Sequence, residues 1–101
     1  MRYEDKPLID NSALQRFELH VDNHIAFIEY KFKDDKLLLL IHTEVPPELE
    51  GKGVASAIVQ KTLQYAKDSN IKIIPHCSFV LSYLEKHPEW NDIIAPKQHK
   101  S

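Results

Sequence analysis

The sequence predicts an α/β fold with a mixed sheet, in the order β-β-β-α-β-α. Phe17, Leu19 and Val21 alternate with polar residues, which is the period of a half-buried strand. The spacing becomes helical from residue 54, and a short β-branched run follows at residues 71–75. A strand, a helix and a second strand in succession join two parallel strands by a right-handed crossover.

Three antiparallel strands are expected before the first helix, at residues 14–21, 24–32 and 37–43. Acidic and amide residues at 22–23 and 34–35 favour the tight turns that join such strands. The third strand contains the unbroken apolar run of residues 37–41, which predicts burial on both of its faces.

The second half of the chain is expected to form a helix at 54–67, a strand at 71–75 and a helix at 78–86. Pro75 has no N–H to donate to a neighbouring strand, so pairing is expected to stop there. His87 precedes Pro88 and is therefore pushed out of the helical region, which ends the second helix.

The 101 residues are enough for one domain with its own apolar core. We expect a polar N-terminal extension at residues 1–13, the folded domain at 14–95 and a short, frayed C-terminal tail at 96–101. Exposed strand edges would allow a monomer or a weak homodimer.

Composition excludes several classes of function. The net charge of −2 provides no overall basic field for nucleic acid, and the longest apolar run is too short to cross a bilayer. Cys77 is the only cysteine, so it forms no internal disulfide, as is usual in a reducing cytosol. The histidines lack metal-ligand spacing, which predicts no metal. A soluble cytoplasmic protein without nucleic-acid or membrane partners is expected.

The most informative segment is the turn at residues 50–56, which contains the only two glycines, Gly51 and Gly53. A nucleotide P-loop is excluded because Lys52 lies between the glycines, and a dinucleotide fingerprint needs three glycines. One interpretation is an anion site in which the N–H groups of residues 51–56 face a phosphate at a helix N-terminus, with Lys52 adding charge. The other is a strand–helix corner where side chains would clash.

This turn resembles the pyrophosphate loop of the GNAT acyltransferase superfamily, Arg/Gln-x-x-Gly-x-Gly/Ala. The similarity is closer to a small single-domain subgroup with further motifs before and after the loop, over about residues 14–94. These motifs are found here at residues 42–46 (His-Thr-Glu-Val-Pro), 75–80 (Pro-His-Cys-Ser-Phe-Val) and 87–90 (His-Pro-Glu-Trp).

The resemblance implies a reduced GNAT-like fold with splayed central strands, and acetyl-CoA or CoA as the cofactor. Its pantetheine arm would lie along Thr43, Glu44 and Val45, with Cys77 beside it. Its pyrophosphate would contact the loop and helix start, which comprise Glu50, Gly51, Lys52, Gly53, Val54, Ala55 and Ser56.

Two departures from the superfamily affect what can be transferred to this chain. Glu50 stands where Arg or Gln is preferred, so its carboxylate is expected to point away or to be offset by Lys52. The chain is also short and lacks the early helices that commonly shape the acceptor site. The acceptor, an amine or a protein, is therefore not identified.

Acetyl transfer needs a proton acceptor for the amine and support for the leaving thiolate. Glu44 is the candidate base, with His42 on the same strand face as a relay, although an exposed carboxylate and a structural imidazole are the alternatives. Cys77 either lines the thioester pocket or accepts the acetyl group covalently. Tyr83 either protonates the leaving thiolate, as the resemblance implies, or packs in the core.

The sequence therefore predicts an acetyl-CoA-dependent N-acetyltransferase in which the amine attacks directly. A non-catalytic module that binds CoA or a protein partner is the first alternative, and a structural domain without a ligand is the second.

Overall fold

The structure is a computed structural model that describes residues 3–96. Five strands form one sheet in sequence order, in which only the last pair is parallel. The strands are β1 (Ile9–Asn11), β2 (Arg16–Val21), β3 (His24–Asp34), β4 (Leu37–Glu44) and β5 (Lys72–Pro75). The helices are α1 (Val54–Asp68) and α2 (Ser78–Lys86), with short 3₁₀ helices η1 (Pro47–Leu49) and η2 (Pro88–Ile93). The predicted mixed sheet and its parallel last pair are confirmed.

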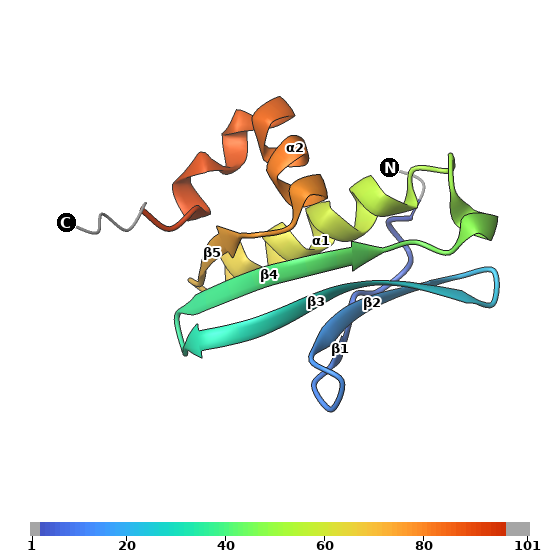
Figure 1. The fold of residues 1–101 in the computed structure, drawn as a ribbon, viewed down its shortest axis with the longest axis horizontal. Coiled ribbons are helices and arrows are strands. Elements are labelled where there is room, and N and C mark those ends of the chain that lie inside the picture. The colour runs from blue at the N-terminus through green and yellow to red at the C-terminus, as the bar shows by residue number, and fades with distance from the viewer. Residues whose placement is uncertain (1–2, 97–101) are drawn as a thin grey trace.

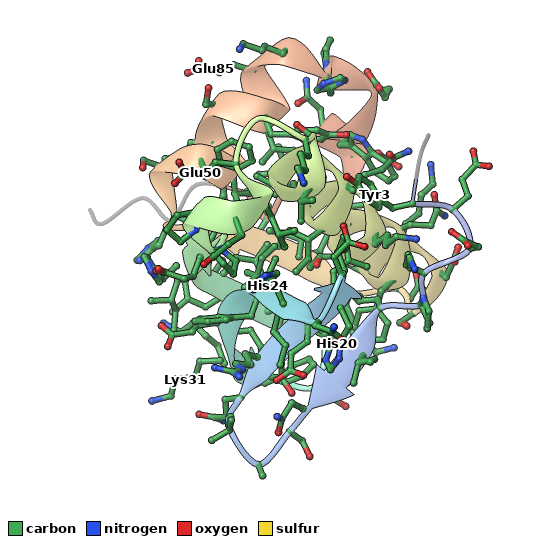
Figure 2. All side chains as sticks on the ribbon, turned by 90° about the vertical axis from the view of Figure 1, so that its right-hand side faces the viewer. Tyr3, His20, His24, Lys31, Glu50 and Glu85 are labelled. Carbon is green, nitrogen blue, oxygen red and sulfur yellow. The ribbon has the colours of Figure 1, made fainter. Side chains whose placement is uncertain are left out.

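Both α-helices lie on the same side of the sheet (Figures 1 and 2). Alternate strand residues point toward them, and Leu38 and Leu40 of β4 are completely buried there. Leu37 and Leu39 face the other way and are half-buried, while Ile41 is 42% exposed. The prediction that this strand is buried on both faces is therefore wrong, because no layer covers the second face within residues 3–96.

The N-terminal segment contributes a strand that the sequence pattern did not indicate. β1 pairs with β2, and its Asp10 accepts a 2.5 Å hydrogen bond from the hydroxyl of Tyr30 on β3. The buried Tyr3 donates a 2.8 Å hydrogen bond to the carbonyl of Lys52 in the glycine turn. Tyr3 and β1 therefore belong to the packed structure. Of the predicted tail at residues 96–101, only Pro96 is among the described residues, so this prediction lies almost wholly outside them.

β4 and β5 part from one another halfway along β4. Their pairing runs only from Leu37 with Lys72 to Leu40 with Pro75, as Pro75 predicted. The N–H groups of His76 and Cys77 then both donate to the carbonyl of Leu40, at 2.9 and 3.1 Å. β4 is also bulged, because Leu40 pairs with Tyr30 and His42 with Glu29, leaving Ile41 unmatched. The predicted splay is present, but at the edge of the sheet, because β5 is its last strand.

Candidate functional site

The glycine turn joins η1 to α1 in a conformation that favours glycine. Gly51 and Gly53 both have φ of 78°, in the left-handed region. A Cβ atom at either position would meet nothing within 4 Å. The glycines therefore do not relieve a clash within the chain, and open space lies in front of the turn.

Most N–H groups of the turn have no acceptor among residues 3–96. The exceptions are Glu50 and Lys52, whose N–H groups donate hydrogen bonds of 3.1 and 3.3 Å to the carbonyls of Pro47 and Leu49. The first bond of α1 runs from Ala57 to the carbonyl of Gly53, at 3.1 Å. The N–H groups without a hydrogen bond to the described chain are those of Gly51, Gly53, Val54, Ala55 and Ser56. They provide the donors and the positive end of a helix dipole, which suit an anion.

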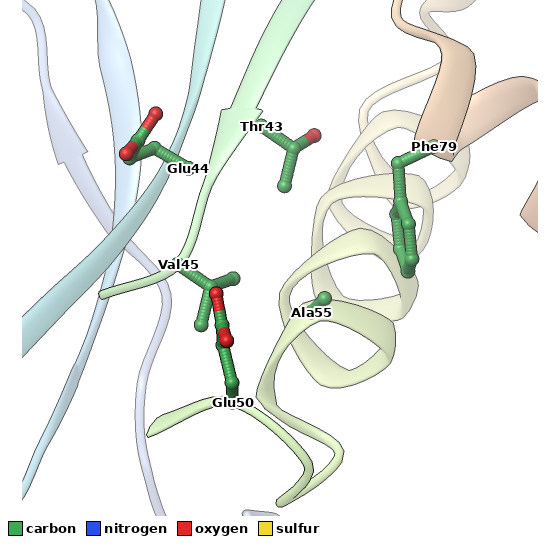
Figure 3. Close-up of a pocket in the computed structure, with 6 residues that line it drawn as sticks. All are labelled: Thr43, Glu44, Val45, Glu50, Ala55 and Phe79. Atoms are coloured by element: carbon green, nitrogen blue, oxygen red, sulfur yellow. The ribbon is translucent and has the colours of Figure 1, made fainter. Parts of the chain in front are cut away.

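A cavity of about 270 Å³ opens beside this turn (Figure 3). It brings together the end of β4, the loop and the first turns of both α-helices. Its lining residues are Thr43, Glu44, Val45, Glu50, Ala55 and Phe79. All except Phe79 were predicted as site residues. Phe79 was not predicted as a site residue, yet the residue is 37% exposed and its ring points toward Ala55 in Figure 3. The signal in the sequence was its place in the motif at residues 75–80, two residues after Cys77.

Thr43 and Cys77 meet between the parted strands. The Thr43 hydroxyl oxygen lies 3.2 Å from the sulfur of Cys77, which precedes the first residue of α2 and is buried. Burial raises the pKa of the Cys77 thiol, but the Thr43 hydroxyl and the backbone amides of Val80, Phe79 and Thr43 outweigh it. The pKa is therefore below its ordinary value of 9.0.

Glu44 lies one residue beyond Thr43 and points to the opposite side of β4 (Figure 3). Its carboxylate is 2.8 Å from Nε2 of His42, and both side chains are 53% exposed. The prediction that His42 and Glu44 share one face of the strand is confirmed. Their contact is on the uncovered face of the sheet, while the helices pack on the other face.

Glu50 does not point away from the cavity. Its carboxylate lies beside Val45 and points along the cavity toward Thr43 in Figure 3. No ion pair between Glu50 and Lys52 is present in the described structure. The expectation that this carboxylate turns outward or is offset by Lys52 is therefore wrong.

Tyr83 lies one helical turn beyond Phe79 and is not among the residues that line the cavity. Its half-buried ring stacks on the imidazole of His87, with ring centroids 4.1 Å apart. Burial, followed by the charge of Glu89, raises the pKa of the Tyr83 hydroxyl despite an opposing hydrogen bond from Trp90. The hydroxyl therefore keeps its proton at neutral pH.

Two kinds of feature, a metal-site cluster and a helix able to span a bilayer, are absent from residues 3–96. No cluster of three or more histidine, cysteine, aspartate or glutamate side chains there has the arrangement of a metal site. In the same region, neither helix combines the length and apolar character needed to span a bilayer.

Comparison with known proteins identifies relatives of this chain. The profile of the GCN5-related N-acetyl-transferase family matches residues 16–93. A solution NMR structure of a GCN5-like protein from Staphylococcus aureus is 33% identical and superimposes with a TM-score of 0.65, covering 84% of this chain and 85% of that one. Protein NATD1 of Gallus gallus, Mus musculus and Homo sapiens is 25% identical over 63 residues, which is 62% of this chain. The match spans little more than half the length of those relatives, 57%, 57% and 56%.

A mixed sheet whose parallel strands part beside a glycine turn, with free amides at the start of a helix, defines a protein of the acetyltransferase-like α/β class. The family match covers more than half of the chain and agrees with the structural match. The chain belongs to the GCN5-related N-acetyltransferase family.

Proposed function

We propose that this protein is an acetyl-CoA-dependent N-acetyltransferase that moves the acetyl group of the CoA thioester to an amine. One observation carries the proposal: the turn with free amides opens into the same cavity that Thr43 lines, and Thr43 contacts Cys77. Family membership supports acetyl transfer in general. The activity of this chain and the identity of its amine belong to the proposal.

The residues present fit CoA at two places. The free N–H groups of residues 51 and 53–56 suit the diphosphate, and the space in front of the glycines admits it. Beyond Leu40 no described strand lies beside β4 on the β5 side, so the backbone of Thr43 and Val45 is available to the pantetheine arm. When bound, acetyl-CoA supplies an acyl carbon that its thioester activates.

The chain's own residues are proposed to accept the proton of the amine, to hold the thioester and to protonate the leaving thiolate. Glu44 is the proposed base, acting through water because its carboxylate lies on the uncovered face beside His42. Cys77 forms the wall of the thioester pocket with Thr43, and direct attack by the amine is preferred over a cysteine intermediate. Tyr83 is the proposed proton donor to the leaving thiolate, and its raised pKa keeps that proton available.

A non-catalytic CoA-binding module is the second candidate function. Two observations favour it: the Tyr83 ring stacks on His87 outside the cavity, and the exposed carboxylate of Glu50 lines the cavity. Both features weaken catalysis or donor binding more than they weaken the fold.

The test combines calorimetric titration with CoA and a thiol-release assay with acetyl-CoA against a panel of small amines and peptides. Saturable CoA binding together with amine-dependent thiol release is expected. Binding without release from any amine would support the module instead. Absence of both binding and thermal stabilisation by excess CoA would contradict both candidates, because a ligand specific for the folded state must stabilise it.

A further inference from the structure

Three carboxylates lie at the end of β4 and in the loop that follows it, and one of them has no partner among residues 3–96. Glu44 is paired with His42 at 2.8 Å, and Glu48 lies 3.9 Å from Nδ1 of His24. Within residues 3–96 the Glu50 side chain has neither a hydrogen bond nor an ion pair. Its charge is therefore uncompensated by the described chain.

The backbone holds Glu50 in this position. Its N–H donates a 3.1 Å hydrogen bond to Pro47, which closes η1, and its own φ and ψ of −65° and 146° are extended. The side chain is thereby directed into the cavity instead of following the turn outward (Figure 3). Gly51, the next residue, begins the turn whose N–H groups are free. The Glu50 carboxylate therefore directly precedes the candidate anion site in the chain.

We propose that Glu50 is a negative charge built into the donor site, which weakens the binding of the CoA diphosphate and speeds the release of spent CoA. This inference rests on the proposed function, because it requires CoA to bind at the glycine turn. The amides attract the diphosphate and Glu50 repels it, so the affinity reflects the difference between the two effects. Among variants of one site, such differences are expressed mainly in the dissociation rate.

The test measures the affinity and dissociation rate of CoA for the full chain and for Glu50→Gln, which removes the charge and keeps the shape. Glu48→Gln is the matched control, since it removes the same charge from the same loop outside the cavity. We expect Glu50→Gln to bind CoA about threefold to tenfold more tightly, the size of effect that one like charge produces in a water-rich site. Most of the gain should be slower dissociation, and Glu48→Gln should change the affinity by less than about twofold.

Two further measurements separate repulsion from a direct contact. Pantetheine has the arm without phosphates, so its affinity should be the same for the full chain and Glu50→Gln. The difference for CoA should nearly vanish at about 1 M salt, where the screening length is about 3 Å. Glu50→Ala should behave as Glu50→Gln does.

The outcomes distinguish this inference from the proposed function. If the unmodified chain binds no CoA, both the proposed function and this inference are wrong. If it binds CoA but Glu50→Gln binds no more tightly, only the inference is overturned. If Glu50→Gln binds both CoA and pantetheine more weakly, Glu50 accepts a hydrogen bond from the pantetheine arm. That result also overturns the inference.

Discussion

The hydroxyl of Thr43 and the thiol of Cys77 lie 3.2 Å apart across the gap where β4 and β5 have separated. This side-chain contact joins β4 to the residue that precedes α2, beyond the last backbone pair of β4 and β5. It also places the only sulfhydryl of the chain beside a residue that lines the cavity. The contact therefore couples the state of the thiol to the site.

Thr43→Val is expected to raise the pKa of the Cys77 thiol. The hydrogen bond from Thr43 is the strongest of the contacts that favour the thiolate, and valine has the same shape without a donor. Thiolate absorbance near 240 nm should then appear at higher pH than in the unmodified chain. Subtracting the titration of Cys77→Ser removes the tyrosine background. An unchanged titration would show that the backbone amides alone set the pKa.

Cys77→Ser tests the preference for direct attack. If the amine attacks the thioester directly, acetyl transfer persists, because serine also fills this buried position. If Cys77 carries the acetyl group, activity should fall by several orders of magnitude, as when a catalytic nucleophile is removed. Intact-protein mass spectrometry during turnover checks the result, since a covalent intermediate adds an acetyl group to the unmodified chain only.

Gly53→Val is expected to reduce CoA affinity far more than it destabilises the fold. The left-handed φ of 78° costs a side chain about 1–2 kcal/mol, while its Cβ meets no atom of the chain. The new side chain occupies the space proposed for the diphosphate. Loss of one hydrogen bond to a charged group reduces affinity by roughly tenfold to a hundredfold.

Asn70→Val is the matched control for that variant. Asn70 also has a left-handed φ, 62°, but it lies beyond the far end of α1 from the turn. Urea unfolding should show similar losses of stability for both variants, and calorimetry should show reduced CoA affinity only for Gly53→Val. Equal CoA affinity of Gly53→Val and Asn70→Val would contradict the assignment of the glycine turn as the diphosphate site.

Local patterns in the sequence predicted most of the fold. The helix at residues 78–86 has the predicted bounds. Pro88 ends it, because the residue before a proline is pushed out of the helical region. β1 was missed, because three residues resembling a turn gain a strand conformation only from contacts with β2 and Tyr30. The burial of β4 was mispredicted because leucines also occupy the half-open second face of the sheet, which no layer covers within residues 3–96.

The candidate site was predictable where residue type determines the backbone conformation. The two glycines and the start of α1 indicated the turn with free amides, whose conformation depends on residue type. The direction of Glu50 and the exposure of Phe79 depend on how the loop and α2 pack together, which no short pattern encodes. The contact of Thr43 with Cys77 joins residues 34 apart in sequence and likewise depends on the tertiary fold.

Stability should fall as the solution becomes acidic, because of one buried carboxylate. Glu18 is 5% exposed on β2 and accepts hydrogen bonds from His20, Arg16 and Asn11 at 2.8, 2.8 and 2.9 Å. The bond from His20 contributes most, and together these contacts overcome burial and lower the pKa of Glu18 from 4.5 to about 2. A pKa depressed by folding stabilises the folded state above pH 4.5 and loses that effect as the pH falls toward 2.

Glu18→Gln should therefore lower the free energy of unfolding at neutral pH and flatten its dependence on pH between about 5 and 2. The loss should be no more than about 2 kcal/mol, because the partners Arg16 and His20 are partly exposed and water screens them. Glu29→Gln, on the same sheet face, is the control, since Glu29 has no ion pair within residues 3–96. Urea unfolding of both variants across this pH range measures the effect. If the free energy of unfolding of Glu18→Gln depends on pH as steeply as that of the unmodified chain, another carboxylate causes the acid sensitivity.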